Sequence, residues 1–284
     1  MFERIGIVGV GLIGGSFGLA MKRALSGVSV VGVGRDRARL EVARSMGAID
    51  EAATDPAALS YCDLVVLATP VDHILSSLPG IAARLAPGTV LTDVGSSKRE
   101  ICLRGAAACP PSVAFVGGHP IAGRELAGVE GSLADLFEGA PWILCPVSGA
   151  ADAVKRLATV VRAAGARPYE MDADEHDRLL SRVSHLPQLL STALGVMVHA
   201  EELEKAGSGL RDMLRLAASP YPVWRAILDT NRDNIDGALA EYIGILEQFR
   251  RDLRTGEVGA AFSRANALSS AWPATAGRGR SGDA

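Results

Sequence analysis

Residues 4–25 read RIGIVGVGLIGGSFGLAMKRAL, and this stretch decides the fold. Its first part, Ile5–Val8, is a short run rich in β-branched residues that predicts a strand, and a helical pattern follows the glycines. Between strand and helix lies the spacing Gly9-x-Gly11-x-x-Gly14. That is the dinucleotide-binding fingerprint in the setting that it requires, and it predicts an α/β domain of the Rossmann type.

Each residue of this turn has an expected role. Gly9 permits a tight turn, Gly11 lets the backbone approach a pyrophosphate, and Gly14 lets the helix pack closely on the strand. Leu12 and Ile13 open the helix, where amide donors and the positive end of the helix dipole favour phosphates. The alternative is a glycine-rich turn without a ligand, but the alternating elements behind it favour a cofactor site.

The end of the second predicted strand, residues 28–34, bears on the choice of cofactor. In proteins that bind NAD, an acidic residue near this point holds the ribose 2′-hydroxyl group. Here Arg35 lies where its guanidinium could pair with a 2′-phosphate, which favours NADP. Asp36 keeps NAD open, and the alternative for Arg35 and Arg37 is that both are solvated surface side chains.

Four further apolar runs predict strands of a parallel sheet that is covered on both faces, at residues 63–70, 89–95, 113–118 and 142–146. Polar or special residues gather where these strands end, namely Thr69, Pro70, Ser96 and His119. In an open parallel sheet the ligand crevice lies outside the carboxyl ends of the strands. We therefore expect Thr69 and Pro70 beside the cofactor, with Ser96 and His119 at the same edge.

The second half of the chain changes character. From about residue 174 to 255 the apolar residues recur at helical spacing, which predicts an all-helical domain of the kind that often forms a homodimer contact. The expected domains are 1–170 for dinucleotide binding, 171–255 for the helices and 256–284 for a flexible tail. Pro187 lies inside the helical pattern, where it should kink the helix at a cost of about 3 kcal/mol.

Composition narrows the class of protein. The chain has 284 residues, 48% of them apolar, and a net charge of −3 without a basic block, so nucleic acid is not an expected partner. Residues 5–21 carry no charge, but six of them are glycine and the run is short for a membrane span. The four cysteines suit free thiols in a reducing compartment. We expect a cytoplasmic protein without membrane contact.

Five histidines are candidates for proton transfer, and no pair has the spacing of a metal site, so no metal is expected. His119 lies at a strand end, where a neutral imidazole could take the proton of an alcohol while hydride leaves its carbon. Ser96 could orient that imidazole, or could instead cap the following helix. Arg215 could bind a substrate carboxylate. His176 and His199 fall in polar helical segments and are expected at the surface.

Six motifs follow one another between residues 9 and 235, and they read GVGLIGGS, DVGSSK, GGHPIAGRE, SHLPQ, LRLAASPYPVW and TNRDNI. As a set they resemble the prephenate/arogenate (cyclohexadienyl) dehydrogenase family of tyrosine biosynthesis. The resemblance implies a Rossmann domain followed by a helical dimerisation domain. It also implies an NAD(P)-dependent oxidoreductase that oxidatively decarboxylates prephenate to 4-hydroxyphenylpyruvate, or arogenate to tyrosine.

The same resemblance implies roles for individual side chains. His119 takes the proton of the ring C4 hydroxyl as hydride passes to the nicotinamide, and Ser96 orients both groups. His185 lies in the substrate pocket on the helical domain, and Trp224 lines that pocket. The alternatives are structural: a core or capping His119, a His185 bonded to a carbonyl freed by Pro187, and a Trp224 that belongs to the core.

Three more positions concern the charged groups of the substrate. The resemblance implies that Arg215 binds a substrate carboxylate and that Glu125 forms an ionic gate with it; the alternative for Arg215 is a salt bridge between domains. Prephenate-specific members often carry a second histidine where this chain has Gln188. A glutamine bears no positive charge and can hydrogen-bond a keto or an amino group, which favours arogenate or both substrates.

Two other functions stay open. One is a different two-domain dehydrogenase or reductase, acting on β-hydroxy acids or on pyrroline carboxylate, which would use a lysine of the helical region or no base at all. Lys205 is the only such lysine, and no catalytic motif surrounds it. The other is a non-catalytic module that senses NADP, which would have no need of His119 and Ser96 together at the sheet edge.

Overall fold

The computed structural model describes residues 2–124, 126 and 128–271. These residues fall into two compact units, divided after Ile235. The first unit holds the whole sheet and the helices up to α9, and it contains the candidate site. The second unit begins within helix α10 at Asp236.

One eight-stranded sheet forms the centre of the first unit, in the order β3-β2-β1-β4-β5-β6-β7-β8. The strands are β1 (Arg4–Val8), β2 (Ser29–Val33), β3 (Glu51–Ala53), β4 (Leu64–Leu67), β5 (Val90–Asp93), β6 (Ala114–Pro120), β7 (Pro141–Pro146) and β8 (Arg167–Glu170). The pairs from β3 to β6 are parallel, as a dinucleotide-binding domain requires. The α/β class predicted from the glycine fingerprint is therefore confirmed.

The sheet departs from the expected parallel arrangement at one edge. β7 runs antiparallel to β6, and β8 follows the direction of β7. The strands β3 and β8 were not predicted, because neither carries an apolar run: β3 reads EAA, and β8 reads RPYE with three exposed residues. Both pair with a neighbour on one side only, and at such edges polar residues and proline are tolerated.

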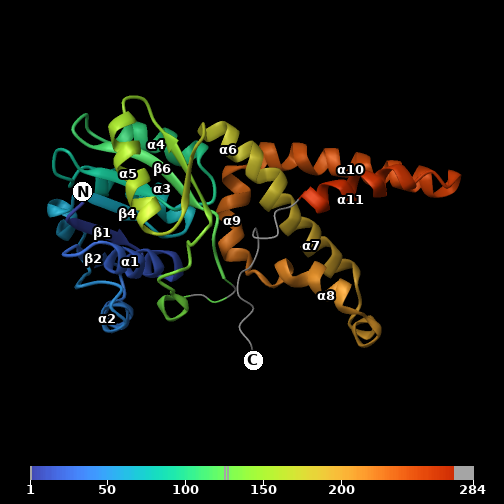
Figure 1. Cartoon of the computed structure of the whole chain (residues 1–284), viewed down its shortest axis with the longest axis horizontal. Coiled ribbons are helices and arrows are strands. Elements are labelled where there is room, and N and C mark those ends of the chain that lie inside the picture. The colour runs from blue at the N-terminus through green and yellow to red at the C-terminus, as the bar shows by residue number, and fades with distance from the viewer. Residues whose placement is uncertain (1, 125, 127, 272–284) are drawn as a thin grey trace. The chain divides into compact units, whose positions relative to one another are not determined.

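Helices cover both faces of the sheet (Figure 1), because its strand residues alternate between two apolar clusters. On β4, for example, Val66 packs with one cluster and Val65 with the other. The first cluster contains α1 (Leu12–Ala24), α2 (Arg37–Ser45) and α5 (Ala151–Ala163). The second contains α3 (Val71–Ala82) and α4 (Arg99–Ala108).

Helices dominate the chain after β8, as expected. Within the first unit they are α6 (Ala173–Leu180), α7 (Leu186–Met197), α8 (Ser208–Leu214) and α9 (Tyr221–Thr230). α6 contacts α4 and β7, and α9 contacts α3, so these helices lie against the edge where the candidate site was expected. α10 (Arg232–Thr255) and α11 (Gly259–Ala271) follow.

A π-helical turn, Ser181–His185, joins α6 to α7 where a proline kink was expected. Pro187 has no N–H group to continue the α-helical ladder, and it occupies the first turn of α7, where proline is tolerated. The preceding backbone instead bonds across five residues, from the Leu186 N–H to the Ser181 carbonyl. The helix thus accommodates its proline by widening one turn, and such turns are frequent at functional sites.

The C-terminal segment departs from the tail that was expected there. The tail predicted at 256–284 is wrong for Gly259–Ala271, which form α11. The segment reads GAAFSRANALSSA, and its alanines and leucine favour a helix despite the weak apolar periodicity that suggested a tail. Residues 272–284 lie outside the described part of the chain. Among the described residues, no helix combines the length and the apolar character that crossing a bilayer requires.

The close packing of α1 on the sheet generates a test of stability. A Cβ added at Gly18 would lie 2.1 Å from the Ala48 carbonyl oxygen, whereas one added at Gly80 of α3 would meet nothing nearer than 3.6 Å. Gly18→Ala should lower the free energy of unfolding by about 1–3 kcal/mol through overpacking. The matched Gly80→Ala should raise it by about 0.5–1 kcal/mol. Urea denaturation measures both, and equal shifts in the two variants would contradict the packing described for α1.

Candidate functional site

The glycine turn after β1 has the geometry of a phosphate cradle. Gly9 has a φ of +91°, which only glycine adopts readily. A Cβ at Gly14 would lie 2.3 Å from the Gly9 carbonyl oxygen, so the helix could not approach this closely with any side chain there. A Cβ at Gly11 would meet nothing within 4 Å, so the backbone faces open space where a pyrophosphate could lie.

The first turn of α1 has donors left for an anion. Gly11 is the N-cap and supplies no side-chain hydrogen bond, and no acidic residue occupies the first turn, which begins with Leu12 and Ile13. Nearby, Thr69 and Pro70 follow β4, and Pro70 is the N-cap of α3. The Thr69 Oγ1 atom is buried without a hydrogen-bond partner among the described residues. These residues fit the dinucleotide that the sequence predicts.

At the end of β2, Asp36 is already engaged by its own helix. Its carboxylate caps α2 by accepting the Arg39 N–H at 3.2 Å, and it pairs with the Arg39 side chain at 3.4 Å. Arg35 is exposed, and Gly34 directly follows the strand. A side chain at Gly34 would first meet Leu40 at 3.5 Å, an ordinary contact. Residue 34 therefore has no acidic side chain of the kind that an NAD site uses. The acidic side chain of Asp36 serves instead as the N-cap of α2.

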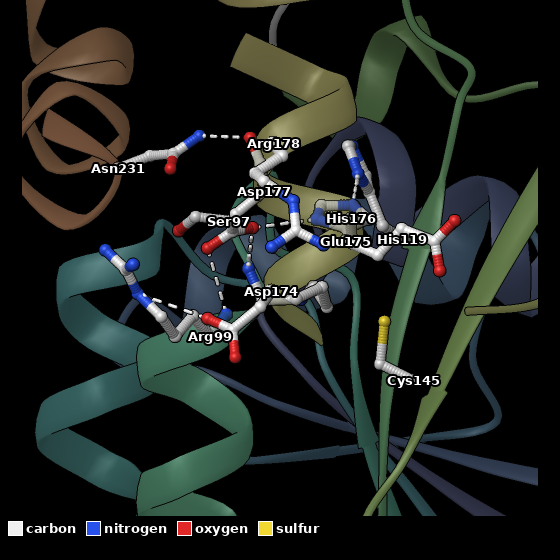
Figure 2. A network of polar contacts seen from close by, with 12 residues as sticks. Ser97, Arg99, His119, Cys145, Asp174, Glu175, His176, Asp177, Arg178 and Asn231 are labelled. Atoms are coloured by element: carbon white, nitrogen blue, oxygen red, sulfur yellow. Dashed lines mark hydrogen bonds and ion pairs between the residues drawn. The ribbon is translucent and has the colours of Figure 1, made fainter. Parts of the chain in front are cut away.

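His119 lies near the end of β6, where it pairs with Ile143 of β7, and its side chain is buried. Its Nδ1 atom is 2.8 Å from Nε2 of His176 on α6. Figure 2 shows His176 between His119 and Asp177, and the His176 Nδ1 atom is 2.8 Å from an Asp177 carboxylate oxygen. Three buried side chains thus form a chain that runs from α6 to the sheet.

This chain sets the tautomer of His119. A carboxylate only accepts hydrogen bonds, so Nδ1 of His176 carries the proton that faces Asp177. The Nε2 atom of a neutral His176 is then an acceptor, and the Nδ1–H group of His119 donates to it. The Nε2 atom of His119 keeps its lone pair, which is the state that a general base needs.

Burial holds the two imidazoles neutral. Burial lowers the pKa of His119 well below 6.5, and the nearby His176 and Lys98 lower it further. Burial also lowers the pKa of His176, although the bond to Asp177 opposes this. Burial alone would raise the pKa of Asp177, but the hydrogen bond from His176 and two backbone N–H groups hold that pKa below 3.8. At neutral pH an ionised carboxylate therefore orients two neutral imidazoles.

Asp177 also caps helix α4 from a distance. Its two oxygens accept the backbone N–H groups of Lys98 at 2.7 Å and Arg99 at 3.0 Å. The alternative that Ser96 caps this helix is therefore wrong: α4 has Lys98 as N-cap and no side-chain cap of its own. Ser97 instead bonds Thr230 at 2.7 Å. One carboxylate on α6 thus holds the β5–α4 loop against the helical region.

A buried ion pair lies beneath this loop. Lys98 and Asp93 are fully buried and form a salt bridge. Asp93 also accepts the backbone N–H groups of Gly95 at 2.7 Å and Gly118 at 3.0 Å, so it ties the end of β5 to β6 beside His119. Removing either partner of such a pair leaves an uncompensated buried charge, which typically costs 3–5 kcal/mol.

His185 occupies the π-helical turn and is buried. Its Nδ1 atom is 3.2 Å from the side-chain amide nitrogen of Asn231, and its ring meets Trp224 edge-on with centroids 6.0 Å apart. Burial lowers the pKa of His185 to about 4. Its Nε2 atom has no partner among the described residues. The alternative was that His185 bonds a carbonyl freed by Pro187. Within the described part of the chain, His185 makes no such hydrogen bond.

The remaining predicted substrate residues lie on α7 and the turn after α8. Gln188 is buried one turn beyond His185, and its amide nitrogen donates to the Thr192 hydroxyl at 3.3 Å. Arg215 begins the 3₁₀ turn Arg215–Ala218 and lines a hollow of about 410 Å³. Ser191 holds this turn on α7, because its hydroxyl bonds the Met213 carbonyl and the Ala217 N–H group. Glu125 lies outside the described residues.

One expectation about the site is corrected by this geometry. His176 was expected at the surface and is fully buried, because its ring bonds His119 and Asp177. Ser96 is half-buried on the β5–α4 loop, but among the described residues the hydrogen bond of His119 runs to His176. The sequence did carry a signal for His176: it precedes the buried Leu180 by four residues, so the two share one helix face.

No group of three or more metal-ligating side chains gathers within the described part of the chain. What gathers at the carboxyl edge of the sheet is instead a pair of buried imidazoles, one offering a lone pair, beside a cradle for a dinucleotide. That combination suits removal of a proton next to a hydride acceptor.

Comparison with known proteins agrees with this geometry. The family model "Prephenate dehydrogenase, nucleotide-binding domain" matches residues 17–170, and "Prephenate dehydrogenase, dimerization domain" matches residues 172–263. A prephenate dehydrogenase of Bacillus subtilis (strain 168) is 33% identical over 259 residues, which are 88% of this chain and 70% of that protein.

Solved structures resemble the chain over nearly its whole length. A crystal structure of prephenate dehydrogenase from A. aeolicus, in complex with hydroxyphenyl propionate and NAD+, has a TM-score of 0.86 and 29% identity, and the match covers 95% of this chain and 96% of that one. A Synechocystis arogenate dehydrogenase has a TM-score of 0.83 and 27% identity, with 94% and 99% covered.

The three buried histidines predict how stability depends on pH. They titrate near 6.5 in the unfolded chain but lower in the folded protein, so unfolding takes up protons as the pH falls below 6.5. The stability that they contribute is complete above pH 6.5 and is lost toward their folded pKa values. For His185, whose pKa is about 4, the loss is about 3 kcal/mol.

Urea denaturation between pH 7 and pH 5 measures this effect, because most carboxylates titrate below that range. The free energy of unfolding should fall steadily as the pH decreases. The variant His185→Gln should show a shallower decrease, since one titrating ring is gone. A flat profile in the unmodified protein would contradict the neutral, buried state of these imidazoles.

Proposed function

Because this chain belongs to the prephenate dehydrogenase family and is an oxidoreductase, we propose that it catalyses the NAD(P)-dependent oxidative decarboxylation of prephenate and arogenate, with His119 as the general base. The observation that carries the proposal is the buried chain from Asp177 through His176 to His119. It leaves the lone pair of His119 Nε2 available at the edge of the sheet where the cofactor cradle lies.

His119 receives the proton of the ring C4 hydroxyl. Oxidised NAD(P), when bound, supplies the hydride acceptor. As the hydroxyl proton passes to His119 Nε2, C4 would give up its hydride to the bound nicotinamide and become a carbonyl carbon. The bond from the ring to its carboxylate then breaks, carbon dioxide leaves, and the electron pair aromatises the ring while the phenol oxygen regains a proton. Ser96, on the neighbouring loop, orients the hydroxyl group.

The main task of the protein is to position these atoms, because aromatisation makes the reaction strongly downhill. His119 lies on a strand that is hydrogen-bonded to both neighbours, so its backbone is held in place. His176 and Asp177 hold the ring orientation. The surrounding burial keeps the imidazole neutral, so it can accept a proton at neutral pH.

The helical region supplies the groups that hold the substrate. Arg215 binds a substrate carboxylate, from a turn that the Ser191 hydroxyl holds on α7. His185 and Trp224, which pack edge-on, line the pocket.

Gln188 bears on the breadth of substrates. Its buried amide is neutral and offers both a donor and an acceptor. Such a group tolerates the keto group of prephenate and the amino group of arogenate, so we infer that both are accepted. The β-hydroxyacid alternative would need a lysine of the helical region, and Lys205 is exposed in the 3₁₀ turn Ala200–Lys205.

We infer that NADP is the preferred cofactor. Support comes from Gly34, which lies where an NAD site would place an acidic side chain, and from the exposed Arg35 beside it. We further propose a homodimer built on the helical domain, residues 171–255, and a cytoplasmic location. The match to a dimerization-domain model and the four free cysteines support these two statements.

A direct assay tests the reaction. Purified protein is mixed with prephenate or arogenate and with NAD or NADP, and the absorbance of the reduced nicotinamide is followed. We expect turnover of both substrates, faster with NADP. If no combination gave a signal while the protein was folded, the proposed function would be wrong.

His119→Asn should lower kcat by about 10²-fold or more, which is the scale of losing a general base. Asparagine keeps a polar side chain of similar size but cannot take the proton. In the unmodified enzyme the acid limb of kcat/KM should lie below pH 6.5, because burial lowers the pKa of His119. Steady-state kinetics from pH 5 to 8 measures both effects. Near-normal turnover of the variant would refute the base assignment.

Gly34→Asp should shift the preference toward NAD, because a carboxylate after β2 bonds a ribose 2′-hydroxyl and repels a 2′-phosphate. A Cβ atom at residue 34 would make only an ordinary contact, 3.5 Å from Leu40. Arg35→Ala should raise KM for NADP about tenfold and leave KM for NAD within about threefold, the effect of losing one charged hydrogen bond. Arg37→Ala is the matched control, since Arg37 pairs with Glu41 of its own helix. Equal effects of both arginine variants would argue against a specific role for Arg35.

A further inference from the structure

We propose that Asn231 sets the tautomer of His185, so that Nε2 of His185 carries the ring proton and donates a hydrogen bond to an oxygen atom of the substrate. Asn231 lies in the TNRDNI segment, between α9 and α10, and is fully buried. The inference rests on the proposed function, because it takes the ligand to be an oxygen-rich cyclohexadienyl acid.

The orientation of the Asn231 amide is determined by three neighbours. Its Nδ2 group donates to the Asp177 backbone carbonyl at 2.8 Å and lies 3.2 Å from Nδ1 of His185. Its Oδ1 atom accepts the side-chain amide of Asn234 at 2.8 Å. Flipping the amide would place Oδ1 against the Asp177 carbonyl oxygen and a donor against the Asn234 donor. Only the unflipped orientation satisfies all three contacts.

The Asn231 donor leaves His185 with one acceptable neutral tautomer. Since Nδ1 accepts from Asn231, it carries no proton, and the ring proton is on Nε2. Burial, which lowers the pKa of His185 to about 4, keeps the ring from gaining a second proton at neutral pH. The Nε2–H donor is buried and has no partner among the described residues. Buried donors are rarely left unpaired, so this one calls for a ligand.

His185 and His119 then offer complementary groups. The chain through Asp177 leaves a lone pair on Nε2 of His119, and the bond from Asn231 leaves a proton on Nε2 of His185. The two rings are close enough for His185 to lower the pKa of His119. A hydroxy acid needs one acceptor for its hydroxyl proton and one donor for an oxygen, and these two nitrogens supply them. Asn231 is therefore a positioning residue that acts through His185.

Nitrogen NMR of the unmodified protein tests the tautomer without any assay. In protein labelled with ¹⁵N-histidine, long-range ¹H–¹⁵N correlations show which ring nitrogen carries a proton, and His185→Gln identifies one of the five ring signals. We expect a neutral His185 protonated at Nε2. Protonation at Nδ1 would overturn the proposal. This outcome does not depend on turnover, so an inactive enzyme would refute the proposed function and leave the tautomer result standing.

Titration with 4-hydroxyphenylpyruvate and oxidised cofactor tests the second half of the proposal. The Nε2–H signal of His185 should shift with the ligand concentration, because the donor gains an acceptor. No shift at saturating ligand would overturn the contact with the substrate.

Asn231→Asp tests the coupling between the two residues. A carboxylate facing Nδ1 requires a proton there, so the His185 signal should change to protonation at Nδ1, and KM for prephenate should rise about tenfold with kcat within about threefold. The matched control is Asn266→Asp, an exposed position on α11, which should change neither. A changed tautomer with an unchanged KM would overturn the role in substrate binding. If Asn231→Asp did not fold, the measurements on the unmodified protein would still decide the proposal.

Discussion

The carboxylate of Asp177 is the interaction on which the site depends. Burying a charge is unfavourable unless hydrogen bonds replace the lost water, and Asp177 accepts three: from His176 and from the backbone N–H groups of Lys98 and Arg99. The first bond orients the ring that in turn orients His119. The other two fix the start of α4 and thus the β5–α4 loop. A single ionised group therefore joins the helical region to the sheet and sets the proton positions at the proposed base.

Charge near the site is arranged so that the histidines stay neutral. Lys98 and Asp93 neutralise each other in the interior, yet the positive charge of Lys98 is close enough to lower the pKa of both His119 and His176. The same pair joins β5 to β6 through Gly118. Structural and electrostatic roles are thus divided within one ion pair, because Asp93 ties β5 to β6 while Lys98 discourages protonation of the nearby imidazoles.

Local signals in the sequence predicted the fold class and the order of the two kinds of domain. The turn at Gly9 and Gly14 obeys steric rules that involve only a few neighbouring residues, and the long apolar runs predicted β4, β5 and β6. The six motifs correctly identified the family. Strands β3 and β8 were not predicted, because an edge strand needs no apolar pattern. The antiparallel direction of β7 was not predicted either. Strand direction is set by how the chain crosses the sheet, and the apolar content of residues 142–146 does not encode it.

The position of a site residue could be predicted from the sequence only where it follows from the end of a strand. His119 was predicted to lie at the ligand edge because strand ends define that edge, and it does lie near the end of β6. His176 was not predicted there, because its partner His119 is 57 residues away in the sequence and its neighbours Glu175 and Asp177 suggest a solvated helix. Asn231 belongs to a motif that marked the family, but its role depends on a contact with His185, 46 residues away. Contacts at such separations follow from tertiary packing.

The π-helical turn at Ser181–His185 changes the direction in which the side chains after it point from the helix axis. In an uninterrupted α-helix each residue turns about 100°, so the nine-residue step from His176 to His185 would place them on opposite sides, about 180° apart. The wider turn rotates less per residue and brings His185 round by roughly a quarter turn. Asn231 bonds the Asp177 backbone carbonyl before this turn and faces the His185 ring within it. The turn has the effect of a one-residue insertion. It brings His176, which leaves a lone pair on His119, and His185, which carries the Nε2–H donor, nearer to one face of the helix.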